Sequence, residues 1–465
     1  MALSLRFSAL LSLFCINSVY ATFGITSGSG FLSVDTGVGL VFRVKTSNGD
    51  IISLKYNGKE WQDQSKFTHI SSGLGSSTVT SKVSGNNAIV TVETPTLTQC
   101  YVAVKGQSAI YIGTYATAEP TVGELRFIAR LKKSVLPKGF AASDIAGGVA
   151  IEASDVFKVG GQTRSKFYSS VPFINDRVHG VTGNGVGAYI VMPGNAYETS
   201  SGGPFMRDIN NQSGTQQEVY FYMNSGHMKT ETYRTGFFGP YALVFTSGAA
   251  PSGNLDTSFF AGLGLTGYVA ASGRGTVKGS VTGIALGFEA VVALKNNSTQ
   301  YWGTASSGDY TISGVNPGTY TATLFKKKLE VGTATVTVSA GKTATLDMKS
   351  TENIRNADTF LTWFLRTEIQ TMHPSDSRMS DWKSATFTIG SSSPASFPMA
   401  QFTVVNNAIT IKWTANSSQI GSRTLRIRTT SSFNGGRPTV KVNSWSGRAP
   451  AAPTKIDSRG VTRGT

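Results

Sequence analysis

Short segments in which apolar and polar residues alternate recur along most of the chain, and turns rich in Gly, Asn and Ser separate them. Residues 39–44 and 88–92 are examples. Alternation with a period of two is typical of a β-strand that has one buried face. The chain has no long run with the period of a helix, and 52 of its 465 residues are Gly, so the sequence predicts an all-β protein.

The spacing of these segments divides the chain into three parts. Residues 22–271 carry widely spaced segments and predict a large antiparallel sandwich. In residues 272–349 the segments follow one another more closely, which predicts a small sandwich of seven strands. The clearest of these candidate strands are residues 275–281, 310–312, 317–324 and 334–338.

The remaining residues, 350–465, predict a third β domain. Its candidate strands lie at residues 408–413 and 424–428. No internal repeat with a fixed period is found in the chain.

Residues 1–21 have the build of a cleaved signal peptide. Arg6 precedes an apolar run at residues 9–16, and the segment ends in Ala21. This run is too short to cross a bilayer, and no later stretch approaches the roughly 18 apolar residues that a membrane helix needs. The sequence therefore predicts a secreted, extracellular protein that begins near Thr22 and has no membrane partner.

The cysteines and the glycosylation motifs agree with export. Cys15 lies in the predicted signal peptide, so Cys100 has no disulfide partner in the mature chain and is expected to be a buried apolar residue. Acceptor motifs for N-glycosylation lie at Asn211, Asn296, Asn297 and Asn416.

The net charge of +16 indicates a polyanionic partner. Outside the cell the common polyanions are acidic polysaccharides. A nucleic acid is not expected, because the chain has no tract dense in Lys and Arg and no zinc-finger spacing. The alternative is that the charge only keeps the protein soluble.

Two segments place cationic side chains on one face of a predicted strand. In residues 124–131 the apolar side chains face one way, which leaves Arg126 and Arg130 on the other face. In residues 163–171 the side chains that share a face are Arg164, Lys166 and Tyr168.

A third segment adds phenols and an imidazole. Tyr220 and Tyr222 alternate with apolar neighbours, and the corner at residues 224–226 is followed by His227. Together the three segments suggest a lysine and histidine active site on a β scaffold. The alternative is that these are ordinary positions facing solvent.

Seven motifs carry a resemblance to a known family: residues 118–120, 123–130, 163–170, 201–205, 223–227, 268–275 and 372–379. They resemble the fungal-type rhamnogalacturonan endolyases of polysaccharide lyase family 4, and the likeness runs from about Phe23 nearly to the C-terminus. The resemblance implies a large galactose-mutarotase-like β-sandwich, then a fibronectin-III-like β-sandwich, then a carbohydrate-binding jelly roll.

The resemblance also implies a reaction and the residues that perform it. The substrate would be rhamnogalacturonan I, an acidic polysaccharide of pectin, cleaved between rhamnose and galacturonate by β-elimination. By motif, the family's catalytic lysine and histidine fall on Lys166 and His227, and its substrate-binding positions fall on Arg126, Tyr220 and Tyr222.

The chemistry of β-elimination makes demands that these residues meet. Arg126 can neutralise the uronate carboxylate with a planar fork, which makes the C5 proton easier to remove. Because H5 and O4 are axial on opposite faces of a galacturonate chair, the base and the acid are expected to be two side chains. We assign Lys166 as the base, with a pKa lowered by burial or by Arg126 and Arg164, and His227 as the acid. The reverse assignment and a tyrosine acid stay open.

The sequence predicts no cofactor and no catalytic metal, because the site is cationic and the other histidines lack a second ligand at metal spacing. These are His69, His179 and His373, and we expect them in turns with structural hydrogen bonds. Hydrolysis by Glu119 and Glu124 is disfavoured, since their spacing gives no two-carboxylate geometry.

Three expectations concern the chain as a whole. It is expected to act as a monomer. Residues 353–366 depart from the family pattern, and the chain stops before the last strands of the jelly roll, so the third domain is expected to be incomplete at its C-terminus. The rival functions are a pectin-binding protein that does not cut its ligand and a lyase that acts on another uronate polymer.

Overall fold

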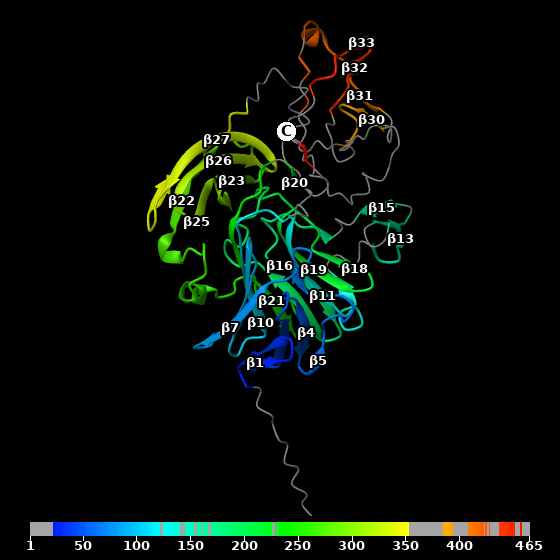
Figure 1. The fold of residues 1–465 in the computed structure, drawn as a ribbon. Helices are drawn as coiled ribbons and strands as arrows, with labels where there is room; N and C mark the ends of the chain where they lie inside the picture. Colours follow the sequence, from blue (N-terminus) through cyan, green and yellow to red (C-terminus); the bar gives the residue numbers. More distant parts are fainter. Residues whose placement is uncertain are drawn as a thin grey trace, which may run out of the picture.

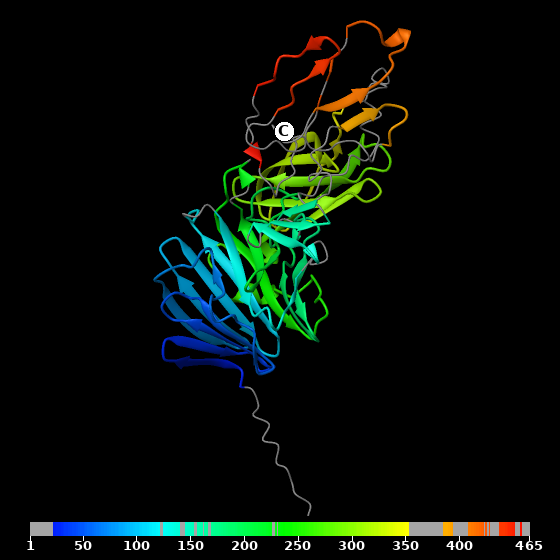
Figure 2. The same cartoon turned by 90° about the vertical axis from the view of Figure 1, so that its right-hand side faces the viewer.

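The computed structural model describes residues 22–120, 124–139, 145–152, 156–160, 162–165, 169–225, 228–229, 231–352, 385–393, 408–422, 424–425, 427, 437–451 and 456–457. Within these residues all regular structure is strand or short 3-10 turn, as the alternating sequence predicts. The same residues contain no helix with the length and hydrophobicity of a membrane span. Figures 1 and 2 show a strand-rich first body, a second sandwich beside one end of it, and strands β30 to β33 beyond.

The first body is organised around an eight-stranded antiparallel sheet. Its strands, in spatial order, are β12 (Lys138–Gly139), β16 (Val178–Gly183), β17 (Val186–Val191), β21 (Gly236–Thr246), β10 (Ala109–Ala116), β9 (Leu97–Val104), β8 (Asn87–Glu93) and β7 (Thr78–Ser84). Its central strands read as nearly continuous apolar runs because both faces of the sheet are buried. Cys100 lies in β9, buried and without a disulfide, as predicted.

Two smaller sheets share the hydrophobic core with one face of the large sheet. The five-stranded sheet contains β1 (Gly24–Gly28), β2 (Phe31–Asp35), β3 (Leu40–Lys45), β4 (Ile51–Tyr56) and β5 (Lys59–Glu60). The four-stranded sheet, in spatial order, contains β18 (Asn211–Ser213), β19 (Gln217–Asn224), β11 (Leu125–Leu131) and β6 (His69–Ile70). Every strand pair in these sheets is antiparallel, so the predicted large antiparallel sandwich is confirmed.

The opposite face of the large sheet is covered by the 3-10 turn η3 (Ser258–Gly262), which contributes the buried side chain of Phe260. A small separate sheet consists of β13 (Val149–Glu152), β14 (Val156–Val159) and β15 (Gln162–Ser165). The short strand β20 (Met228–Lys229) pairs with β34 (Ile456–Asp457), which joins the first body to the far end of the described chain.

The second body is a β-sandwich with its own core. One sheet contains β25 (Asp309–Val315), β22 (Gly275–Thr282), β28 (Thr343–Thr345) and β29 (Met348–Lys349). The other contains β24 (Gln300–Thr304), β23 (Ala290–Lys295), β26 (Gly318–Lys326) and β27 (Leu329–Val338). Because β28 and β29 pair in succession with the same strand, β22, they occupy one edge of the sheet, and the sandwich has the seven strand positions that the sequence predicts.

An ion pair between the partly buried Arg274 and the buried Glu198 joins the two bodies just after the 3-10 turn η4 (Ala271–Gly273). Both Arg274 Nη1 and Arg274 Nη2 donate to the Glu198 carboxylate, over 2.6 and 2.8 Å. The Tyr301 hydroxyl donates to the same carboxylate over 2.7 Å, and Arg274 also reaches the carbonyl of Gly314. The contact therefore ties one residue of the first body to three of the second.

The third part is described only in pieces. Strands β30 (Ala385–Thr388) and β31 (Ile409–Lys412) pair in parallel, and β32 (Lys441–Val442) pairs with β33 (Trp445–Ser446); a 3-10 turn, η6, spans Ser417–Gln419. The candidate strand at 408–413 is confirmed by β31. The candidate strand at 424–428 is wrong in its described residues, since Thr424, Leu425 and Ile427 are irregular and exposed. The segment 353–366 lies outside the described residues.

Candidate active site

The candidate site lies on the outer face of the four-stranded sheet, where β11 and β19 run side by side. Their antiparallel register places Arg126 opposite Tyr222, Ile128 opposite Tyr220, and Arg130 opposite Glu218. The alternate residues of both strands, among them Phe127 and Phe221, pack into the main core. The period-two reading of both segments is therefore confirmed, and three of the predicted site residues, Arg126, Tyr220 and Tyr222, share one face.

Arg126 and Tyr222 form the centre of this face. The Arg126 guanidinium donates from Nη1 to the Tyr222 hydroxyl over 2.9 Å, and its Cζ lies 5.6 Å from the centroid of the Tyr222 ring. The same Nη1 forms an ion pair with Glu124, the residue just before β11. The Nε of Arg126 is buried and has no hydrogen-bond partner among the described residues. Arg126 thus stands charge-paired in this structure, with one donor still unsatisfied.

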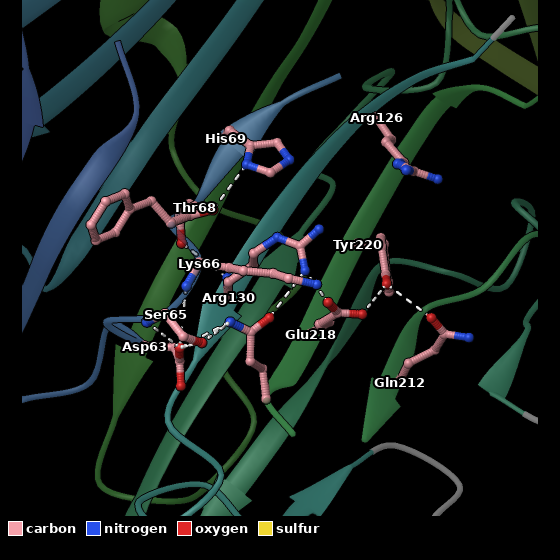
Figure 3. A network of polar contacts seen from close by, with 12 residues as sticks. Asp63, Ser65, Lys66, Thr68, His69, Arg126, Arg130, Gln212, Glu218 and Tyr220 are labelled. Carbon is pink, nitrogen blue, oxygen red and sulfur yellow. Dashed lines mark hydrogen bonds and ion pairs between the residues drawn. The ribbon is translucent and has the colours of Figure 1, made fainter. Parts of the chain in front are cut away.

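The two tyrosines continue the network along the strand. Their rings stack with centroids 5.6 Å apart. The Tyr220 hydroxyl donates to Glu218 and lies 3.0 Å from Gln212 Oε1, while Glu218 pairs with Arg130 (Figure 3). A continuous chain of polar contacts therefore links Arg130 to the phenol of Tyr220.

Burial decides the protonation of these groups. Tyr220 and Tyr222 are each only 5% exposed, because Ile128 and Ile209 pack against their rings. Burial raises the pKa of Tyr222 well above its usual value, and the Asp208 carboxylate raises it further. Burial and then Glu218 do the same to the pKa of Tyr220. Both phenols therefore keep their protons at neutral pH and can act as hydrogen-bond donors.

The Arg126 guanidinium stays charged for a different reason. Burial by itself would lower the pKa of Arg126, but Tyr222 and Glu124 outweigh that effect and raise it. A cation that is fixed in this way can bind a carboxylate at any physiological pH.

His69 belongs to the same face, although the sequence predicted it in a turn and outside the site. It lies in β6 opposite Ile128, beside Arg126 and Arg130 (Figure 3), and not in a turn. Its Nδ1 lies 2.9 Å from the carbonyl of Phe67; since a carbonyl only accepts, Nδ1 carries the proton and Nε2 is the acceptor. Burial and then the charge of Arg130 lower the pKa of His69 to about 4. A two-residue strand has no periodicity, so no sequence pattern marked this position.

The corner that leads to His227 is held by side-chain contacts. The Ser225 hydroxyl donates to Asp208, and the Tyr233 hydroxyl donates to the carbonyl of Ser225. Asn224 Nδ2 donates to the carbonyl of Arg234 over 3.1 Å. Asp208 also lines a small pocket together with Tyr220 and Tyr222. The last described residues before His227 are therefore fixed beside the two tyrosines.

The segment that follows Lys166 is anchored to the same neighbourhood. The buried Ser169 hydroxyl donates to the carbonyl of Asn211 over 3.0 Å and accepts from the backbone amide of Asn210 over 3.1 Å. The amide of Tyr220 donates to the carbonyl of Asn210 over 2.9 Å. Ser169 thus connects the chain after Lys166 to the strand that carries Tyr220.

A buried His–Asp pair supports that strand from the other side of the pocket. His179 Nε2 lies 2.6 Å from the carbonyl of Tyr220, and Nδ1 lies 2.9 Å from Asp176 Oδ1. Asp176 also accepts from the Tyr197 hydroxyl. Burial alone would lower the pKa of His179, but Asp176 raises it above its usual value. The predicted structural role of His179 is confirmed, but it lies in strand β16 and not in a turn.

Several predicted site residues cannot be placed. Lys166, Tyr168 and His227 lie outside the described residues, and so does His373. Arg164 is half-buried in β15, opposite Phe157, in the small separate sheet. The roles assigned to these residues stay predictions.

In the described part of the chain, no group of three or more His, Cys, Asp or Glu side chains is arranged to hold a metal ion. The predicted absence of a metal and of a cofactor stays a prediction.

Comparison with protein families gives three consecutive matches. Residues 23–267 match the model described as "Rhamnogalacturonan lyase B, N-terminal". Residues 277–346 match "Polysaccharide lyase family 4, domain II", and residues 345–465 match "Polysaccharide lyase family 4, domain III". The matched order is the order of bodies in the fold.

Curated relatives are similar over nearly the whole chain. A protein named probable rhamnogalacturonate lyase A, from Aspergillus terreus, is 49% identical over 96% of this chain and 86% of its own length. Rhamnogalacturonate lyase A of Aspergillus aculeatus is 48% identical over 97% of this chain and 88% of its own length. The protein of that name from Aspergillus niger is 48% identical, over 98% of this chain and 94% of its own length.

Proposed function

Because the chain belongs to polysaccharide lyase family 4, we propose that it cleaves the rhamnose–galacturonate bond of rhamnogalacturonan I by β-elimination. Membership confirms the resemblance that the motifs carry, and the three matched models agree with the predicted order of β domains. The product would carry an unsaturated galacturonate at its new non-reducing end. We further propose that the protein is secreted, since its substrate is a wall polysaccharide and residues 1–21 read as a signal peptide.

One observation carries the proposal. The guanidinium of Arg126 and the protonated phenols of Tyr220 and Tyr222 share a sheet face, and the segments next to Lys166 and His227 in the sequence are hydrogen-bonded beside them. Ser169 and Ser225 bond to the single segment 208–211. Lys166 is three positions before Ser169 in the sequence. His227 is two positions after Ser225.

Arg126 is proposed to bind the uronate carboxylate. Neutralising that carboxylate lets the C5 carbon bear the negative charge that develops when H5 leaves. In the free protein Arg126 is paired with Glu124, so the substrate carboxylate must either take the place of Glu124 or use the unsatisfied Nε edge. The planar fork of arginine suits both arrangements.

Proton transfer is assigned to Lys166 and His227. One removes H5, the C4–O4 bond breaks as the C4=C5 double bond forms, and the other protonates O4 of the departing chain. We assign Lys166 as the base and His227 as the acid, and we expect burial or nearby cations such as Arg164 to lower the pKa of Lys166. We propose Tyr222, which is protonated and bonded to Arg126, as the phenol that helps the acid.

The test is to incubate the purified protein with rhamnogalacturonan I and to follow the ultraviolet absorbance of the conjugated product. Only elimination creates that double bond, so a pectin-binding protein would give no signal. Homogalacturonan run in parallel shows whether another uronate polymer is also cut. No signal with either polymer would contradict the proposal.

The assignments are tested by Lys166→Ala and His227→Ala. Each should lower kcat by about 10²–10⁴-fold, which is the usual contribution of a general acid or base. Lys158→Ala is the matched control, because Lys158 is an exposed lysine on the neighbouring strand β14. If Lys166→Ala kept nearly full activity while folding normally, the assignment of the base would be wrong.

A further inference from the structure

Two cationic side chains are buried where the first body contacts the second, near enough for the charge of Arg207 to act on Lys328. Arg207 follows Phe205, whose ring lies 5.2 Å from the ring of Phe325 in the second body. Lys328 is a turn residue of the β26–β27 hairpin, three positions after Phe325. Arg207 is 4% exposed and Lys328 is 8% exposed. Each is about as buried as the apolar residues beside it.

Among the described residues, neither cation has a counter-charge. In the part of the chain that the structure describes, no hydrogen bond or ion pair is formed by the side chain of Arg207 or of Lys328, and Arg207 Nε is a buried donor without a partner. The neighbouring lysines of the hairpin are placed differently. Lys326 is paired with Glu352, and the Nζ of Lys327 lies 5.5 Å from the centroid of the Phe288 ring.

Burying two unpaired positive charges together is unfavourable, because each loses its hydration and the two repel each other. This penalty lowers the pKa of both side chains. Burial lowers the pKa of Arg207 to about 10, and burial together with the charge of Arg207 lowers the pKa of Lys328 to about 7. A bound anion would remove both penalties at once.

We propose that Arg207 and Lys328 form an anion-binding site between the first and second bodies, which takes a carboxylate or a comparable small oxyanion. The low exposure of both side chains restricts the ligand to a small group. Two sources share this chemistry: a uronate carboxylate of the bound polysaccharide and a free inorganic anion. Only the uronate source rests on the proposed function.

A connection to the candidate active site exists through the chain itself. Asp208, the residue after Arg207, lines the pocket with Tyr220 and Tyr222 and accepts a hydrogen bond from Ser225. Filling the anion site would therefore fix the segment that carries one wall of that pocket.

The pH dependence of anion binding follows from the charges around Lys328. Arg207 faces it from the first body, and Lys326 with its partner Glu352 and Lys327 lie on its own side. A bound anion needs the ammonium form of Lys328, and this form is lost as the pH rises through about 7. Binding should therefore weaken about tenfold between pH 6 and pH 8.

The test uses inorganic sulfate, whose charge does not change between these pH values, and follows thermal unfolding of the full chain. Sulfate should raise the Tm of the native protein and of the control Lys327→Met, which changes the net charge equally. It should give no such increase in Lys328→Met or Arg207→Met. Equal responses in all four proteins would overturn the proposal, because the effect would then be nonspecific.

A second variant covers the case in which the methionine variants fail to fold. Lys328→Arg keeps the positive charge but does not titrate in this range. It should bind sulfate equally at pH 6 and pH 8, whereas the native protein should lose about tenfold. A tenfold loss that persists in Lys328→Arg would overturn the role of Lys328.

The two sources are then separated by kinetics on rhamnogalacturonan I. If a uronate is the ligand, Lys328→Met raises KM and sulfate competes with the polysaccharide. If the ligand is a free anion, sulfate raises the Tm without competing. Either result supports the site and assigns its source. Because the Tm measurement needs no catalysis, an inactive protein would count against the proposed function and leave the anion site testable.

Discussion

Two cations on the outer face of β11 and β19, Arg126 and Arg130, differ from two cations at the junction between the first two bodies, Arg207 and Lys328, in whether a carboxylate balances their charge. On the sheet face, Arg126 is paired with Glu124 and Arg130 with Glu218. At the junction, Arg207 and Lys328 have no carboxylate partner among the described residues. Both arginines of the sheet face thus have a carboxylate partner before a ligand arrives, whereas Arg207 and Lys328 at the junction have none among the described residues.

The origin of this difference is local. Strand register sets Glu218 directly opposite Arg130, and Glu124 is two positions before Arg126, so the same alternation that exposes the arginines supplies their acids. Arg207 lies in a loop and Lys328 lies in a turn of another body, and no shared register brings an acid to them. We infer that Arg126 exchanges Glu124 for the substrate carboxylate when substrate binds. Arg207 and Lys328 instead gain an anionic partner that they lack in the free protein.

The junction can nevertheless neutralise a buried cation, as Arg274 shows. Its guanidinium is bound by both oxygens of Glu198, which also accepts from Tyr301. Arg274→Met should destabilise the contact between the bodies by about 3–5 kcal/mol, because it leaves the Glu198 carboxylate buried without its partner. Urea unfolding monitored by fluorescence measures this, with Lys278→Met, an exposed lysine of β22, as the control.

The double variant Arg274→Met with Glu198→Gln should recover part of that loss, since the unpaired charge is removed as well. A loss below about 1 kcal/mol for Arg274→Met would mean that the junction tolerates unpaired charge generally. The contrast with Arg207 and Lys328 would then disappear.

His69 reports the positive charge that remains at the sheet face. Its pKa is lowered to about 4 by burial and then by Arg130, while the unfolded chain titrates near the usual 6.5. The stability that His69 contributes is therefore complete above pH 6.5 and is lost as the pH falls towards 4, by at most about 3 kcal/mol. His69→Asn should flatten the stability curve in this window, measured by denaturant unfolding at several pH values.

His179 provides the opposite case in the same fold. Asp176 raises its pKa, so its contribution is complete below pH 6.5 and is lost as the pH rises through the raised value. The two histidines therefore act in different pH windows. If His69→Asn altered stability only above pH 6.5, the assigned effect of Arg130 on His69 would be wrong.

These local contacts also show what the sequence could predict. Period two in residues 124–131 and 219–223 correctly separates the core side from the site side, because a strand forces alternate side chains to opposite faces. It does not show that Tyr220 and Tyr222 are buried. Their cover includes Ile209, which comes from a neighbouring segment whose position depends on the tertiary fold.

Contacts between residues that are distant in the sequence could not be predicted from it. Glu198 and Arg274 are 76 positions apart, and a pairing over that distance has no local pattern. His69 occupies a two-residue strand, which is too short to show a period. For Glu124 the alternation gives the same face as Arg126, but the ion pair itself is seen only in the fold.

The proposed exchange of Glu124 for the substrate carboxylate takes place on Arg126. Arg126→Ala should lower kcat/KM on rhamnogalacturonan I by about 10²-fold, since it removes the group proposed to stabilise the charge that develops at C5. Arg43→Ala is the matched control, because Arg43 lies in β3, where its Cζ is 4.5 Å from the centroid of the Phe31 ring. Unchanged kcat/KM in Arg126→Ala would show that another cation binds the carboxylate.

The smallest expected effect comes from replacing Glu124, the ion-pair partner that Arg126 is proposed to give up when substrate binds. If Glu124 only balances the charge of Arg126 in the free protein, Glu124→Gln should lower KM by no more than about fivefold, because a partly exposed ion pair is worth about 1 kcal/mol or less. The control is Glu93→Gln, an exposed acid of β8. A raised KM would mean that Glu124 contacts the sugar chain directly. Glu124 would then be part of the binding site, because the substrate would need the charges of both Arg126 and Glu124 in place. The proposed exchange of Glu124 for the substrate carboxylate would be wrong.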